Sequence, residues 1–415
     1  MASKQAMAQR SQTKVHFDHR DMDYYLSWVL GREVWGASEP VECMGVAARI
    51  TDGDPQSWQQ EWRPLAEQVE ELAASELRAG NSEAAKSTYL RACTYYRAPL
   101  FMMHPTTPAF RENWQKMQAC FRRAAALADP PIEAIQVPYQ GRQLAGYFQA
   151  AEPGNHPRPT LLIIGGIETF AEDCYLMSGP AAIQQGYHVL TVDLPGQGMN
   201  PEQGLFLEAR SEIPLQAVVD YALTRPEIDP QRLALFGFSW GGHIVLRAAQ
   251  FEDRLRALIA NPATYNMFSS ALAQQRSGHG KSDPVVQLVF QQLAWRFGVN
   301  LGNLAGRLVK GYEFLRHARA DCSLIGCPTL CMAGESEARV TLEQTRTCYA
   351  RLPHPLKKLA ILTAEEGGAA HCQVDNLPLL NRVIFDWLNG IIEEEYSPGD
   401  YETSGDTEGQ SSGCA

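Results

Sequence analysis

Apolar residues follow two different spacings along the chain, and the change between them falls near residue 130. Before this point the apolar positions recur at helical spacing. One such stretch begins at Ser57, a residue type that favours the N-cap position, and ends at Gly80. The stretch 82–103 then runs back as a second helix. The spacing therefore predicts a helical N-terminal domain over residues 21–130.

Beyond this domain the pattern changes to alternation with turn signals, and then to short apolar runs separated by helix-like segments. Because these runs are apolar on both faces, they predict parallel strands that are covered by helices on both sides. We therefore expect an α/β core over residues 131–395, built on a mostly parallel sheet. The predicted strands cover residues 159–166, 188–196, 232–239, 256–262, 328–335 and 357–364.

One connection within the predicted core is much longer than the others. Residues 264–325 have the pattern of a helical insertion over one edge of the sheet, and long insertions of this kind tend to be lids or binding elements. We expect residues 1–20 to be a flexible N-terminus and residues 396–415, which are polar and rich in Gly and Ser, to be a disordered tail. Aromatic side chains of the insertion either wall an apolar substrate pocket or serve as core; they are Phe268, Phe290, Trp295, Phe297 and Tyr312.

Composition and short motifs indicate which partners, cofactors and cellular compartment to expect. The net charge of -11 comes without any cluster of Lys or Arg, which argues against nucleic acid or an anionic membrane as a partner. The 10 cysteines lie in apolar stretches without C-x-x-C spacing, so we expect buried free thiols in a reducing compartment. No apolar segment reaches transmembrane length, and no metal-binding or nucleotide-binding motif is present. These features predict a cytoplasmic protein that needs no cofactor.

The most informative stretch is "GFSWGG", residues 237–242, which stands between a predicted strand and a predicted helix. A serine hydroxyl is a poor nucleophile unless a base removes its proton and hydrogen-bond donors hold the charge that develops after attack. A sharp strand-to-helix turn lifts such a serine above the sheet, and glycines two residues to either side remove side chains that would collide. The context predicts that Ser239 is a nucleophile.

The acid and the base of such a site follow the serine in chain order. The strand over residues 328–335 delivers two carboxylates at its carboxyl end. We expect Glu337 to be the acid, because its spacing from the strand tip carries it towards the upper edge of the sheet, with Glu335 as the alternative. His371 follows the last strand in a glycine-rich loop, and is the expected base.

An oxyanion hole needs two N–H donors. Trp240, next to the nucleophile, is the expected source of one of them. The loop after the first parallel strand, "GGIETF", supplies the other from Ile167 or Gly166. The tight turn "DLPGQG", residues 193–198, has a structural role in this interpretation.

Together these residues and motifs resemble the α/β-hydrolase superfamily, and in particular its branch with an N-terminal helical cap. That branch includes 2,6-dihydropseudooxynicotine hydrolase, the fermentation-respiration-switch esterase-like proteins, and fungal hydrolases of polyketide clusters of the pigment-heptaketide and fusarin types. The resemblance rests on "YLRACTYYR", "GGIETFAED", "DLPGQG", "GFSWGG" and "HCQ". It covers nearly the whole chain except about twenty residues at each end.

The resemblance implies that Ser239 is the nucleophile and His371 the base. The branch usually has aspartate where this chain has Glu337, and also where it has Glu168, which we interpret as a residue that orders its loop. Some relatives form dimers through the helical region, so a homodimer is expected by analogy.

The site residues and the resemblance together predict a serine hydrolase that acts on an ester, a thioester or a carbon-carbon bond next to a carbonyl. The substrate would be a small apolar or polyketide-like molecule of secondary metabolism. One alternative is release or ring closure of an acyl chain by the same three residues. Another is a binding scaffold without catalysis, which an intact serine, acid and histidine in the right order argue against.

Overall fold

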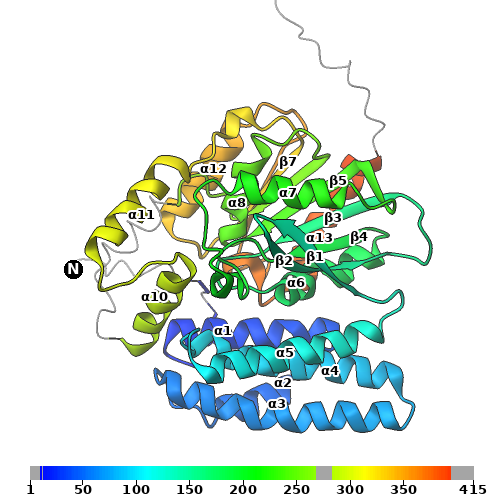
Figure 1. Ribbon diagram of the computed structural model, residues 1–415, viewed down its shortest axis with the longest axis vertical. Coiled ribbons are helices and arrows are strands. Elements are labelled where there is room, and N and C mark those ends of the chain that lie inside the picture. The colour runs from blue at the N-terminus through cyan, green and yellow to red at the C-terminus, as the bar shows by residue number, and fades with distance from the viewer. Residues whose placement is uncertain (1–9, 12, 268–282, 394–415) are drawn as a thin grey trace, which may run out of the picture.

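The computed structural model describes residues 10, 11, 13–267 and 283–393. A layer of helices from the N-terminal part of the chain lies along one side of an α/β unit, and two further helices, α10 and α11, lie at one end of it (Figure 1). The chain therefore enters the sheet only after the helical layer is complete.

The helical layer, called the helical region below, begins with α1 and ends with α5. Its longest helix, α3, begins earlier than the sequence indicated, because the N-cap is Asp54, whose carboxylate accepts the N–H of Gln56, and not Ser57. The Ser57 hydroxyl instead accepts the N–H of Thr51. The elements are α1 (Arg20–Leu30), η1 (Gly31–Trp35), α2 (Pro40–Ala47), α3 (Pro55–Arg78), α4 (Ser82–Arg97), η2 (Ala98–Met102) and α5 (Pro108–Ala126).

The core is an 8-stranded sheet in the order β1-β2-β4-β3-β5-β6-β7-β8. The neighbours from β4 to β8 pair in parallel, whereas β1 and β2 form an antiparallel hairpin that pairs with β4. The expected α/β fold with a mostly parallel sheet is confirmed. The strands are β1 (Glu133–Tyr139), β2 (Arg142–Gln149), β3 (Arg158–Ile164), β4 (His188–Val192), β5 (Ile228–Phe238), β6 (Ala257–Asn261), β7 (Thr329–Gly334) and β8 (Lys358–Leu362).

Both faces of this sheet are covered. Side chains alternate along a strand, so Leu161 and Ile163 of β3 join one buried cluster while Leu162 and Ile164 join the other. The first cluster continues into the helical region, so that region and the sheet share one core. The covering helices are α6 (Ala171–Gln184), α7 (Glu212–Ala222), α8 (Trp240–Ala249), α12 (Arg339–Arg351) and α13 (Leu377–Glu393), with short helices η3 (Asn200–Gln203), η4 (Cys322–Leu324) and η5 (His371–Gln373).

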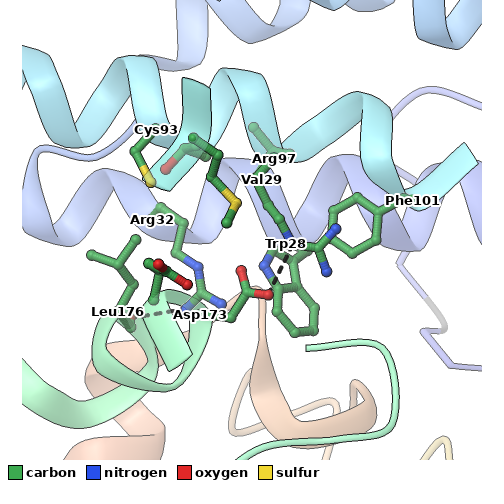
Figure 2. A pocket seen from close by; sticks show the side chains of 11 residues that line it. Trp28, Val29, Arg32, Cys93, Arg97, Phe101, Asp173 and Leu176 are labelled. Atoms are coloured by element: carbon green, nitrogen blue, oxygen red, sulfur yellow. Dashed lines mark hydrogen bonds and ion pairs between the residues drawn. The ribbon is translucent and has the colours of Figure 1, made fainter. Parts of the chain in front are cut away.

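A buried ion pair joins the helical region to α6 (Figure 2). The Nε of Arg97, at the end of α4, lies 2.8 Å from Oδ2 of Asp173, and both side chains are 5% exposed. The Arg97 guanidinium also lies 3.9 Å from the ring centroid of Phe101. Beside this pair is a cavity of about 10 Å³, which is near the minimum that holds one water molecule. Its polar lining includes Arg32, whose Nη1 donates to the carbonyl of Leu176.

The long connection predicted over residues 264–325 contains two described helices, α10 (Pro284–Arg296) and α11 (Leu304–His317). Helix α10 is tied to both parts of the molecule. Its Gln292 amide donates to three carbonyls of the helical region, those of Leu100, Phe101 and Met103. Arg296 is 1% exposed and donates to the carbonyl of Gly196 in the core at 3.0 Å.

Part of the predicted flexible N-terminus is folded against the helical region. The Asp23 carboxylate accepts the backbone N–H groups of Val15, His16 and Phe17, and the Phe17 side chain is 3% exposed. The predicted tail, residues 396–415, lies outside the described residues. Within the described parts of the chain, none of the helices combines the length and apolar character needed to cross a membrane, and the nine described cysteines are free thiols.

Candidate active site

Ser239 occupies the turn between β5 and α8 with a positive φ of 57°. Its N–H donates to the carbonyl of Asn261, at the end of β6, over 2.6 Å. Glycine is needed on both sides of this turn. A Cβ at Gly237 would lie 2.2 Å from the carbonyl oxygen of Gly241, and a Cβ at Gly241 would lie 2.4 Å from that of Ile164. The close packing of the two glycines thus leaves the serine at the tip of the turn.

His371 and Glu337 meet Ser239 in the folded chain. Nε2 of His371 lies 3.0 Å from the Ser239 Oγ, and Nδ1 is hydrogen-bonded to a carboxylate oxygen of Glu337. With the proton on Nδ1 donated to this carboxylate, Nε2 is free to accept the serine proton. Burial lowers the pKa of His371, but the neighbouring Cys372 and the Glu337 carboxylate outweigh burial, so the pKa lies above its ordinary value.

The two carboxylates after β7 have different partners. Glu335 is exposed, and its Oε2 accepts the N–H of Ala364 at 2.8 Å. Glu337 is 7% exposed at its side chain and faces His371. The structure therefore pairs the histidine with Glu337.

Gly166, in the loop after β3, lies against the nucleophile, and Ile167 follows it in the chain. A Cβ at Gly166 would lie 2.9 Å from the Cβ of Ser239 and 3.1 Å from its Oγ, so only glycine allows this approach. Trp240 is the first residue of α8, where an N–H has no partner within the helix. Among the described residues, the N–H groups of Gly166, Ile167 and Trp240 donate to no other protein group. They are therefore available to an oxygen bound beside Ser239.

A buried glutamine that the sequence analysis did not single out braces the histidine loop. Gln373, fully buried, donates through Nε2 to the carbonyls of Gly368 and Ala370 at 3.0 Å. Its Oε1 accepts the side-chain amide of Asn261, the same residue whose carbonyl binds the Ser239 N–H. One hydrogen-bonded link thus joins the serine turn to the histidine loop. The "HCQ" motif was the only available signal for it.

The insertion brings an aromatic cluster to the Trp240 side of the site. The ring of Phe297 lies 5.7 Å from that of Trp240 and 4.8 Å from that of Phe314, measured between centroids. Ile167 packs against the same cluster. Phe297 was predicted to bind substrate, whereas Phe314, the buried residue of α11, was not predicted.

The other aromatic residues predicted to bind substrate lie elsewhere. Trp295 packs edge-on against Phe110 of the helical region. Phe290 is 49% exposed and Tyr312 is 63% exposed, and neither belongs to the cluster around Trp240. Phe268 lies outside the described residues. Of the predicted aromatic residues that the structure describes, only Phe297 lies in the cluster around Trp240.

The N-terminal segment also contacts the site, which the sequence did not predict. The backbone N–H of His371 donates to the carbonyl of Arg10. The Arg10 guanidinium stacks over the Tyr24 ring at 5.0 Å and lies 3.7 Å from a carboxylate oxygen of Glu168. Glu168 also accepts the hydroxyl proton of Tyr25 at 3.0 Å. These contacts order Glu168, the residue that follows Ile167.

No group of three or more His, Cys, Asp or Glu side chains that could hold a metal ion occurs in the described part of the chain.

The sequence pattern of the family described as "Esterase FrsA-like" matches residues 32–300, which is more than half of the chain. The chain belongs to the FrsA-like esterase family. The prolyl oligopeptidase family also matches, over residues 209–392, which contain the serine turn and the histidine loop. The protein is therefore a hydrolase of the α/β type.

Similar proteins match most of the chain. "Hydrolase ORFZ" of Pyricularia oryzae is 28% identical, over 90% of this chain and 97% of its own. "20-hydroxy-prefusarin hydrolase FUS2" of Gibberella moniliformis is 28% identical, over 88% of this chain and 94% of its own. The crystal structure of "2,6-dihydroxy-pseudo-oxynicotine Hydrolase" has a TM-score of 0.70 at 21% identity, and covers 88% of this chain and 95% of that one. This last similarity establishes a common fold that includes the helical region.

Proposed function

We propose that this FrsA-like hydrolase uses Ser239 as a nucleophile to cleave a bond next to a carbonyl in a small apolar substrate. The observation that carries the proposal is the 3.0 Å contact between the Ser239 Oγ and Nε2 of His371, with Glu337 on the opposite ring nitrogen. A serine, a histidine and a carboxylate that are hydrogen-bonded in this arrangement perform acyl transfer on several unrelated folds. A binding scaffold has no need for all three.

In the proposed reaction, His371 takes the hydroxyl proton as Ser239 attacks the carbonyl carbon. The negative charge that develops on the carbonyl oxygen is held by the N–H groups of Ile167 and Trp240. Glu337 keeps the proton on Nδ1 and stabilises the imidazolium. The imidazolium then gives its proton to the leaving group, and an acyl group stays on the serine. Water, activated by His371, releases the acid and restores the hydroxyl.

The leaving group is an alcohol, a thiol or a carbon. In the last case the substrate is a β-dicarbonyl compound, whose carbon-carbon bond breaks to leave an enolate, and the imidazolium proton converts the enolate to a ketone. The aromatic cluster of Trp240, Phe297 and Phe314 favours an apolar acyl chain or ring. The relative whose name gives 20-hydroxy-prefusarin as its substrate supports a polyketide-type molecule of secondary metabolism as the substrate of this chain.

The homodimer expected by analogy with relatives stays a prediction.

A fluorophosphonate probe tests the nucleophile. Intact-protein mass spectrometry of the wild type should find one adduct, mapped to Ser239, with no adduct on Ser239→Ala and strongly slowed labelling of His371→Ala. A wild type that admits the probe but stays unlabelled would overturn the proposal. With β-diketones and esters as substrates, incorporation of one solvent oxygen into the acid product then distinguishes hydrolysis from ring closure by an internal nucleophile.

A further inference from the structure

The peptide unit between Gly166 and Ile167 is the part of the site on which this inference depends. Its carbonyl oxygen belongs to Gly166 and its N–H to Ile167. In a trans peptide these two groups point in opposite directions within one plane. Whatever fixes the carbonyl of Gly166 therefore also fixes the direction of the Ile167 N–H.

Two buried side chains donate to that carbonyl. The Thr169 hydroxyl lies 2.8 Å from the Gly166 oxygen, and the Gln197 amide nitrogen lies 3.0 Å from it. Thr169 is 2% exposed and Gln197 is 1% exposed, so water does not compete for these bonds. An amide hydrogen bond in such surroundings is costly to leave unmade. The carbonyl is thus held toward Thr169 and Gln197, and the Ile167 N–H points to the opposite side of the peptide plane.

Gln197 is itself fixed at both ends of its amide. Its nitrogen also donates to the carbonyl of Gly165 at 2.6 Å, and its oxygen accepts the N–H of Leu194 at 2.9 Å. The turn that carries it is braced by the insertion, because Arg296 donates to the carbonyl of Gly196. The sequence indicated a structural role for the turn over residues 193–198. In the structure, Gln197 of this turn also bonds directly to the loop that carries Ile167.

We propose that Gln197 and Thr169 are positioning residues that aim the Ile167 N–H at the oxyanion. The inference rests on the function proposed above, and adds the residues that make the oxyanion hole ready before substrate binds. When either donor is lost, the peptide unit turns more freely and the Ile167 N–H spends less time in the productive direction. Loss of a whole oxyanion-hole donor costs about 10²–10³ in kcat, so partial misalignment should cost roughly 10-fold to 100-fold.

The test compares side chains of equal size with and without the donor. Thr169→Val keeps the shape of the side chain and removes the hydroxyl, while Thr169→Ser keeps the hydroxyl and serves as the matched control. Gln197→Met removes the amide at similar length and provides a second, independent variant. We expect Thr169→Val and Gln197→Met to lose kcat for a 4-nitrophenyl ester by roughly 10-fold to 100-fold at nearly unchanged KM, and Thr169→Ser to keep most of it.

A second measurement separates positioning from general damage. A trifluoromethyl ketone adds to the serine and forms an oxyanion, whereas the corresponding methyl ketone binds mostly without reacting. Affinity for the trifluoromethyl ketone should fall in parallel with kcat, while affinity for the methyl ketone and the pH dependence of kcat/KM should stay as in the wild type. Unchanged kcat in both donor-free variants, or equal loss of affinity for the two ketones, would overturn the inference alone. A wild type that neither hydrolyses the ester nor binds the trifluoromethyl ketone would overturn the proposed function, and the inference with it.

Discussion

The backbone N–H of His371 donates to the carbonyl oxygen of Arg10 over 2.7 Å, although the two residues lie near opposite ends of the chain. The guanidinium of the same arginine stacks over Tyr24, whose ring centroid lies 6.0 Å from that of His371. The N-terminal segment therefore supports the base through its main chain, and its arginine side chain packs on the tyrosine beside the base.

Removal of residues 1–13 should weaken this support. The histidine loop would keep Gln373 as a brace but would lose the acceptor for the His371 N–H. We expect kcat for a small ester to fall by roughly 10-fold, because misplacement of a catalytic group by a fraction of an ångström is costly. Steady-state kinetics of the truncated protein measure this. Removal of residues 1–9 alone, which keeps Arg10, is the control, and an equal loss in both truncations would contradict the prediction.

Glu337→Gln should shift the pH dependence. The Glu337 carboxylate favours the imidazolium and is one of the groups that hold the pKa of His371 above its ordinary value, against the opposing effect of burial. A general base must be neutral, so wild-type kcat/KM should rise with pH through this raised pKa. Without the carboxylate the pKa falls. The rise should therefore move to lower pH, while the plateau drops by roughly 10²-fold to 10⁴-fold, because an amide no longer stabilises the imidazolium.

The control for this substitution is Glu335→Gln. Glu335 is exposed and bonds to the N–H of Ala364, so its loss should leave both the plateau and the midpoint of the pH profile close to those of the wild type. If Glu335→Gln moved the midpoint and Glu337→Gln did not, the assignment of the acid would be reversed.

The sequence predicted those parts of the site that are local in the chain. Ser239 and its flanking glycines stand in one turn, and the order of strands was enough to place His371 after the last of them. Spacing favoured Glu337 over Glu335 as the acid, and in the structure Glu337 is the carboxylate that faces the histidine. The contacts of Arg10 with His371, and of Gln373 with Asn261, join segments that are far apart in sequence. Neither local periodicity nor motif spacing contains information about such pairs.

The aromatic cluster makes a prediction about substrate choice. Phe314 is 8% exposed and touches both Trp240 and Phe297, so truncation to alanine opens space beside the site. Phe314→Ala should lower kcat/KM for esters with aromatic or long acyl chains by roughly 10-fold relative to acetate esters, which is about 1.4 kcal/mol of binding. A series of 4-nitrophenyl esters measures this ratio. Tyr312→Ala, two residues away and 63% exposed, should leave the ratio unchanged.

The Arg97–Asp173 ion pair should contribute to the free energy of unfolding, and Arg97 should also help to hold the loop before α6 in place. The Arg97 guanidinium donates to the Asp173 carboxylate, and at 3.0 Å to the carbonyl of Glu168. The same carboxylate also accepts the N–H of Phe170. Arg97→Met leaves Asp173 as an unpaired buried charge, so the free energy of unfolding should fall by about 3–5 kcal/mol. The double variant Arg97→Met with Asp173→Asn should recover part of this loss, because residue 173 then no longer carries an unpaired negative charge.

Urea denaturation of the single and double variants measures the free energy of unfolding. The reference is the exposed pair of Arg63 and Glu112, whose side chains are 36% and 53% exposed, and Arg63→Met should cost about 1 kcal/mol or less. Both the single variant Arg97→Met and the double variant should have a lower kcat than the wild type, because both lack the arginine that donates to the carbonyl of Glu168. Recovery of stability together with full recovery of kcat would mean that Arg97 acts on the fold alone and has no influence on the loop that carries Ile167.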